Sequence, residues 1–129
     1  MAKTALDLSP EERRSFRTAD EIHRRKMDHQ SEIDVRREEA WRVARQAAEL
    51  LRDEFGATKV VVFGSLAHAD WFTPWSDLDL SAWGIAPSQF YKAVAALMDI
   101  SSEFRIDLVD PLACKVELRG TIEREGIEL

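Results

Sequence analysis

The sequence predicts a small α/β (α+β) protein in which a mixed sheet of three to four strands is packed with helices and preceded by a long helical N-terminal region. Three observations predict this fold class. The first third of the chain is charge-rich with helical spacing of its apolar residues, short strand-like runs follow, and a helical segment separates the last two runs. A chain of 129 residues suits one domain, 1–129, with a helical region at 10–55 and a core at 58–129.

The helical region has a recognisable start and end. Ser9 suits the N-cap, Pro10 the first helical position, and Glu12 completes a capping box. Gly56 suits a left-handed cap after the last turn. One helix over this length would be ~69 Å long at ~1.5 Å per residue, more than a domain of this size can cover. We therefore expect either a bend near residues 30–31 or a first part that projects towards a partner.

The second half of this region has the better apolar stripe and should pack against the sheet; its members are Trp41, Ala44, Ala48 and Leu51, flanked by Ala47 and Leu50. Residues 11–39 are dominated by charge, which leaves two readings open: a solvated helix face, or an arm that binds a partner or makes a homo-oligomer. His23 and His29 are six residues apart, so they do not share a helix face and are expected at the surface rather than as metal ligands.

The central motif begins with the continuous apolar run at 60–63, which is typical of a strand buried on both faces. Gly64 and Ser65 follow directly and lead into a short helix. A glycine backbone and a hydroxyl beside the first N–H groups of a helix favour phosphate binding. The sequence therefore predicts a phosphate-binding turn at Gly64 and Ser65.

Carboxylates follow this turn on two further strand-like segments. Asp77 and Asp79 alternate with Leu78 and Leu80, so both carboxylates should project from one face. Close carboxylates usually imply a cation, and oxygen ligands favour magnesium. Asp107, on the strand-like segment 105–110, would complete a triad if its strand pairs beside the first one. Three carboxylates around two cations can align an attacking hydroxyl with a nucleoside triphosphate.

The order of these residues resembles the nucleotidyltransferase superfamily that includes polymerase β, and most closely its minimal nucleotidyltransferases, often found as antitoxins of HEPN toxin pairs. The pattern Gly-Ser-x-Ala-x-Gly, spacer, Ser-Asp-x-Asp-Leu is matched over about residues 58–129 by Gly64, Ser65, Ala67, Ser76, Asp77, Asp79 and Leu80. Two positions depart from it: His68 stands where a basic residue is common, and Ala69 where a second glycine is common.

The resemblance implies transfer of AMP from ATP to an acceptor hydroxyl, with two Mg²⁺ ions as cofactors. Asp77, Asp79 and Asp107 would be the catalytic and metal-binding residues, and Gly64, Ser65 and Ser76 would bind the nucleotide. It further implies a HEPN toxin protein as partner and acceptor. Two alternatives stay open: a small-molecule nucleotidyltransferase of the aminoglycoside-modifying type, and a catalytically silent module that neutralises a partner by contact.

Charge and composition limit the partners and the cellular compartment that we expect for this chain. The net charge of −6 is concentrated in residues 58–129, which hold 6 Lys and Arg against 11 Asp and Glu, so direct nucleic-acid binding is not expected. No apolar run approaches a membrane span and no signal peptide is evident, which predicts a cytoplasmic protein without membrane contact. Cys114 is the single cysteine and is expected to be a small buried hydrophobe.

The remaining elements complete the sheet. The aromatic residues around the central motif, Trp71, Phe72, Trp75 and Trp83, are expected mostly to close the core, although an exposed ring could stack on adenine. Residues 88–104 should form a crossover helix that returns the chain to a strand at 106–109. A last helix is predicted over 116–125, stopped by Gly126.

Overall fold

The computed structural model describes residues 10–68 and 70–129, with side chains from residue 19 onward, so the predicted cap at Ser9 and the departure at Ala69 lie outside the described residues. The elements in order are α1 (Pro10–Phe55), β1 (Lys59–Phe63), the 3₁₀ helix η1 (Gly64–Ala67), β2 (Leu78–Trp83), η2 (Pro87–Gln89), α2 (Phe90–Met98), β3 (Ile106–Val109), α3 (Val116–Glu125) and β4 (Ile127–Glu128). This is the predicted mixed α/β class.

The four strands form one mixed sheet in the order β3-β2-β1-β4. β1 pairs antiparallel with β2, placing Phe63 opposite Asp79, while β2 and β3 are parallel, placing Asp79 beside Asp107. The parallel pair follows from the crossover through α2, as predicted. β4 adds two residues to the outer side of β1 and was not predicted, because two residues carry no readable periodicity.

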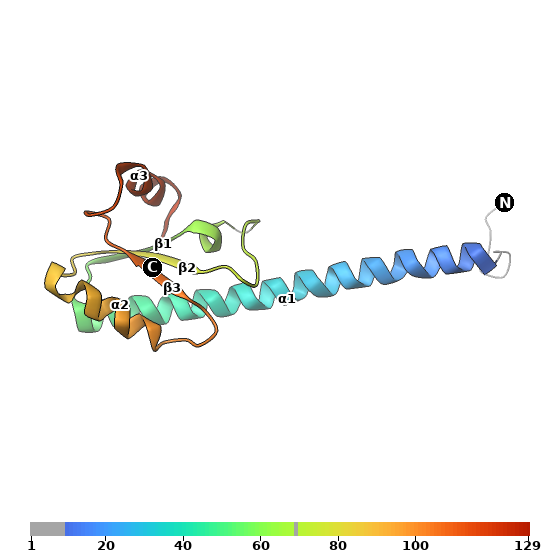
Figure 1. The fold of residues 1–129 in the computed structure, drawn as a ribbon, viewed down its shortest axis with the longest axis horizontal. Helices are drawn as coiled ribbons and strands as arrows, with labels where there is room; N and C mark the ends of the chain where they lie inside the picture. The colour runs from blue at the N-terminus through green and yellow to red at the C-terminus, as the bar shows by residue number, and fades with distance from the viewer. Residues whose placement is uncertain (1–9, 69) are drawn as a thin grey trace. The chain divides into compact units, whose positions relative to one another are not determined.

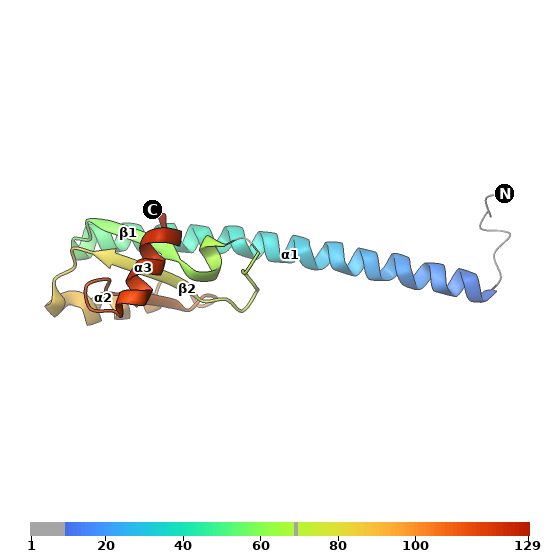
Figure 2. The ribbon, with the colours of Figure 1, turned by 90° about the horizontal axis from the view of Figure 1, so that it is seen from above.

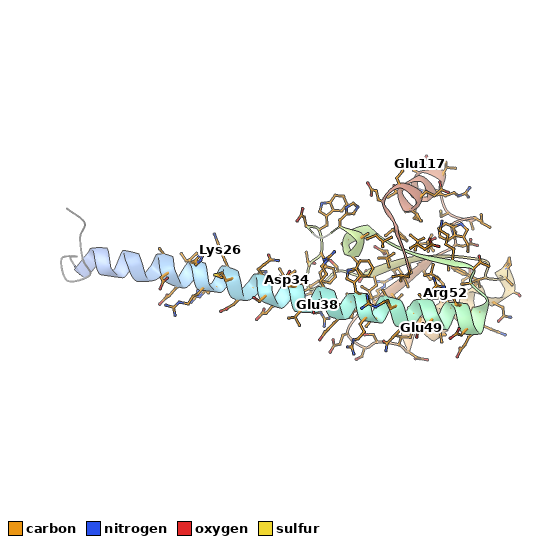
Figure 3. All side chains as sticks on the ribbon, turned by 180° about the vertical axis from the view of Figure 1, so that it is seen from behind. Lys26, Asp34, Glu38, Glu49, Arg52 and Glu117 are labelled. Carbon is orange, nitrogen blue, oxygen red and sulfur yellow. The ribbon has the colours of Figure 1, made fainter. Side chains whose placement is uncertain are left out.

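The sheet is covered on both faces (Figure 1, Figure 2): α3 lies on one face, and α2 with the C-terminal half of α1 lies on the other. In Figure 3, Glu117 on α3 and Glu49 on α1 mark these opposite sides. Val61 and Phe63 of β1 pack with Ile122 of α3. Leu78 and Leu80 point the other way and are fully buried. Because β1 is buried on both faces, its apolar run is continuous rather than alternating.

Helix α1 keeps its α-helical hydrogen bonding through Gln30 and Ser31, where the sequence left a bend open. The contacts divide the chain into two units, with the boundary after Asp34. In the first part, residues 19–32 are all exposed, His23 and His29 among them, and the labelled Lys26 points into solvent (Figure 3). No described helix is long and apolar enough to cross a membrane.

In the second part, the predicted stripe of α1 is buried at Ala44, Ala47, Ala48 and Leu51. Trp41 is only partly buried, because the larger ring lies at the edge of the stripe where small alanines make the close contact. Gly56 takes a left-handed φ of 72°, as its position after the helix predicts.

Other expectations are corrected by the structure. Helix α2 begins at Phe90 after a 3₁₀ turn and ends at Met98, so it is shorter than the predicted 88–104 and Ser88 is not its N-cap. Cys114 is half-buried, because it lies in the turn before α3 rather than in the core. Helix α3 has the predicted bounds, and Gly126 is its C-cap.

Candidate active site

The site lies where β1 ends and where β2 and β3 begin. Antiparallel pairing brings the end of β1 next to Asp79, and parallel pairing sets Asp107 beside Asp79 on the same face. The Leu78 N–H donates to the Arg105 carbonyl at 2.9 Å, which aligns the starts of β2 and β3. Asp79 and Asp107 therefore come together as the sequence predicts, and Asp77 directly precedes the same strand.

Gly64 makes room for the Asp79 carboxylate. Its φ is +73°, a left-handed conformation that side chains rarely adopt, and a Cβ there would overlap the Asp79 Oδ2 atom. Glycine is thus needed at this position for two reasons: the left-handed turn, and the close approach of a carboxylate. The residue predicted to form a phosphate-binding turn also forms one wall of the aspartate cluster.

The carboxylates interact electrostatically. The pKa of Asp79 is raised from 3.8 to about 6, first because burial disfavours the charged form and then because Asp107 and Asp77 repel it. All three aspartates therefore act on one small volume. A cation placed there would relieve the repulsion.

Arg105 is close to this cluster. Its Nε lies 3.3 Å from Asp107 Oδ1, in an ion pair that is largely exposed and therefore weak. As the chain stands, no group of three or more His, Cys, Asp or Glu side chains in the described residues could hold a metal ion. The aspartates are neighbours, but they do not form a closed cage of three ligands.

The two serines of the motif have different local roles. Ser65 lies in η1, a four-residue 3₁₀ helix, where the sequence predicts a short helix. Ser76 closes the turn before Asp77: the Thr73 N–H donates to Ser76 Oγ at 2.9 Å, and the Ser76 N–H donates to the Thr73 carbonyl at 3.0 Å. Ser76 therefore holds the turn that precedes Asp77.

Two contacts around η1 are not predicted by the sequence pattern. Arg37 of α1 donates from one guanidinium nitrogen to the Leu66 carbonyl at 3.4 Å. His68 Nε2 lies 3.3 Å from Glu125 Oε2 at the end of α3. The turn after β1 is thus tied to a helix on each face of the sheet. Charged residues are common throughout this chain, so nothing in their spacing singles out these two pairs.

The loop after η1 carries exposed aromatic side chains. Trp71 is 60% exposed and Trp75 is 84% exposed, whereas Phe72 is buried. The expectation that most of these rings close the core is therefore wrong for Trp71 and Trp75, because the loop holds them away from the sheet. The Trp71 ring lies over His68 with a centroid separation of 4.0 Å. An exposed indole therefore lies in the loop that follows η1.

The donor chemistry of the aspartates suits magnesium. Hard oxygen ligands are those that Mg²⁺ prefers, and it is commonly held by one or two carboxylates plus substrate phosphates rather than by an all-protein cage. Adjacent Asp79 and Asp107 and the nearby Asp77 fit this mode. The lack of a preformed three-ligand group among the described residues is compatible with it.

Comparison with known proteins does not assign the chain to a family. The sequence matches no protein-family model. None of the curated proteins is significantly similar to it.

Proposed function

We propose that the chain is a metal-dependent nucleotidyltransferase that transfers AMP from ATP to an acceptor hydroxyl. The observation that carries this proposal is the meeting of Asp79 and Asp107 in parallel register beside Gly64, whose lack of a side chain makes space for the Asp79 carboxylate. Paired carboxylates next to a glycine turn and a serine hydroxyl match the needs of triphosphate chemistry.

In the proposed reaction, Asp77 and Asp79 would hold the magnesium ions with Asp107, and Ser65 with nearby backbone N–H groups would bind the β and γ phosphates. Bound magnesium supplies neutralisation of the triphosphate charge and of the charge that develops in the transition state. The acceptor oxygen forms a bond to the α-phosphorus, the bond to the bridging oxygen breaks, and pyrophosphate leaves. Asp107 accepts the proton of the acceptor hydroxyl, so positioning rather than a protein nucleophile provides the rate enhancement.

Trp71 and Trp75 support a purine nucleotide as the donor. An exposed indole can stack on a base, and Trp71 is held by the His68 ring close to the end of η1. The stacking partner on one side of Trp71 leaves the other ring face for a ligand. This arrangement would orient the base while η1 binds the phosphates.

The proposed acceptor is a HEPN-type toxin, with the chain acting as antitoxin. This part of the proposal rests on the resemblance of the Gly-Ser and Ser-Asp-x-Asp-Leu segments to minimal nucleotidyltransferases. The small size of the unit 35–129 supports a macromolecular acceptor, because few residues remain outside the sheet and its covering helices to enclose a small substrate.

The test is incubation of the full chain with α-labelled ATP and magnesium, with and without the product of the adjacent gene. We expect label on that partner, lost in Asp77→Asn and retained in Asp99→Asn, an exposed aspartate at the end of α2. Label on a small-molecule acceptor instead would favour the aminoglycoside-type alternative. Absence of transfer to any acceptor in the presence of the partner contradicts an enzymatic role.

A second candidate is a silent module that neutralises a partner by contact, and two observations favour it. Asp107 is already paired with Arg105, and no three-ligand group is preformed in the part of the chain that the structure describes. Neutralisation of the partner by Asp77→Asn as effective as that by the parent chain would support this function. Loss of neutralisation in that variant, with the fold intact, would exclude it.

A further inference from the structure

Arg36 of α1 binds the segment 101–104, which leads from α2 into β3. One terminal nitrogen of its guanidinium donates to Glu103 Oε2 at 2.8 Å, and the other donates to the main-chain carbonyl of Glu103 at 2.8 Å. The guanidinium also lies over the Phe104 ring, with Cζ 4.1 Å from the ring centroid. A single arginine thus contacts the side chain and the backbone of one residue and the ring of the next.

The segment 101–104 also has hydrogen bonds of its own. Ser101 Oγ accepts the N–H of Glu103 at 3.1 Å and the N–H of Phe104 at 3.2 Å. The Phe104 side chain is buried, whereas Glu103 is exposed. The segment therefore has a defined local shape, and Arg36 attaches it to α1.

This segment continues directly into the aspartate cluster. The next residue, Arg105, accepts the Leu78 N–H on its carbonyl at 2.9 Å, and β3 begins one residue later. Asp107 then pairs with Asp79 in the parallel ladder. Strand β3 has four residues and lies at the edge of the sheet, with β2 on one side. Because a short edge strand has few backbone bonds, the position of Asp107 depends on how the segment before it is anchored.

Packing alone does not hold the segment against α1. A groove of about 370 Å³ lies between them, lined by Glu39, Arg42, Val43 and Gln46 of α1 and by residues 100–104. Open space along the helix leaves more of the attachment to the contacts of Arg36.

These contacts require an arginine and not only a positive charge. The Glu103 carboxylate is 61% exposed, so its charge attraction to Arg36 is weak by itself. Lysine could keep that attraction, but it lacks the planar fork that donates to two acceptors at once and stacks on an aromatic ring. The fork fixes the main chain of Glu103 as well as its side chain.

We propose that Arg36 is a positioning residue of the candidate active site and sets the place of Asp107 relative to Asp79. It acts through Glu103 and Phe104, without touching either carboxylate. The link to catalysis rests on the proposed function, in which both carboxylates hold magnesium. Mg²⁺ demands nearly ideal octahedral geometry, so a small displacement of one carboxylate lowers the affinity. Residues outside the ligand shell commonly control metal affinity in this way.

The first test is amide hydrogen exchange of the full chain, measured by NMR without metal. Arg36→Lys keeps the charge and loses the fork, and Arg45→Lys makes the same change at an exposed arginine of the same helix. The Asp107 N–H faces β2, and we expect it to exchange about fivefold faster in Arg36→Lys, with the amides of β1 unchanged. Arg45→Lys should match the parent. Unchanged exchange at Asp107 overturns the proposal, and so does equal acceleration in β1, which would show a general loss of stability.

The second test is calorimetric binding of α,β-methylene-ATP, which cannot transfer AMP, with and without magnesium. We expect the affinity for the magnesium complex to be about tenfold lower in Arg36→Lys than in the parent and unchanged in Arg45→Lys. Adding Glu103→Gln to Arg36→Lys should cause little further loss, because both act through one contact. Parental affinity in Arg36→Lys overturns the proposal even if Asp107 exchanges faster. A parent chain that does not bind the complex contradicts the proposed function instead, and the exchange measurement still decides whether Arg36 positions Asp107.

Discussion

Asp79→Asn should stabilise the folded protein at neutral pH. The pKa of Asp79 is raised from 3.8 to about 6 by burial and by the charges of Asp107 and Asp77, so ionising this group costs free energy in the folded state. The difference corresponds to roughly 3 kcal/mol, and screening by solvent at a partly exposed group reduces it to about 1 to 2 kcal/mol. Asparagine has nearly the same shape and carries no charge.

The stability that Asp79→Asn gains over the parent chain should depend on pH with a definite sign. Below the unfolded pKa of 3.8 the carboxyl is protonated in both states, so the substitution changes little there. Between 3.8 and about 6 the unfolded chain loses its proton first, and the stability of the parent falls as pH rises. Above about 6 the penalty is complete, and the advantage of the variant should be constant.

Urea unfolding followed by the fluorescence of the four tryptophans, from pH 4 to pH 8, measures this difference. Asp99→Asn, at an exposed position, is the matched control and should show no such pH-dependent gain. A variant less stable than the parent at pH 7, or a gain that does not shrink towards pH 4, would refute the reasoning. Millimolar magnesium should stabilise the parent and not the variant, since it relieves the same repulsion.

Gly64→Ala should destabilise the fold by more than the ~1–2 kcal/mol that a left-handed alanine costs, because the new Cβ also meets Asp79 Oδ2. Gly56→Ala is the control, since Gly56 has a similar φ and open space around it. Thermal melts of both variants separate the backbone cost from the cost of the overlap. Gly126→Ala should loosen α3, since its Cβ would overlap Val61 and the Ile122 carbonyl, and faster hydrogen exchange in α3 than in α1 would show it. Trp71→Ala should weaken binding of a fluorescent ATP analogue by about 5- to 100-fold if the ring stacks on the base, as stacking contributes ~1–3 kcal/mol, whereas equal affinity would rule the ring out.

Much of the fold could be predicted because the local signals agree with the tertiary structure. The apolar run of β1 is buried on both faces, and the alternation around Asp79 separates its carboxylate from the buried Leu78 and Leu80. Gly126 ends α3 at the predicted position. In each case the residue types and their spacing depend on the same burial that the structure shows.

The parts that could not be predicted depend on contacts distant in sequence. β4 has two residues and is held by pairing with Val61 and Val62. The exposure of Trp75 depends on where a loop is held, and hydrophobicity alone favours a core position. Arg37 reaches the Leu66 carbonyl across 29 positions of the chain, and no periodicity in a charge-rich helix marks one arginine for that contact.

Asp107 has two partners to reconcile, because its carboxylate is paired with Arg105 and is also proposed to hold a cation. Magnesium and the Arg105 guanidinium would compete for the same negative charge. The ion pair between Arg105 and Asp107 is largely exposed and therefore weak, so a doubly charged cation held by Asp79 and Asp107 together would displace it.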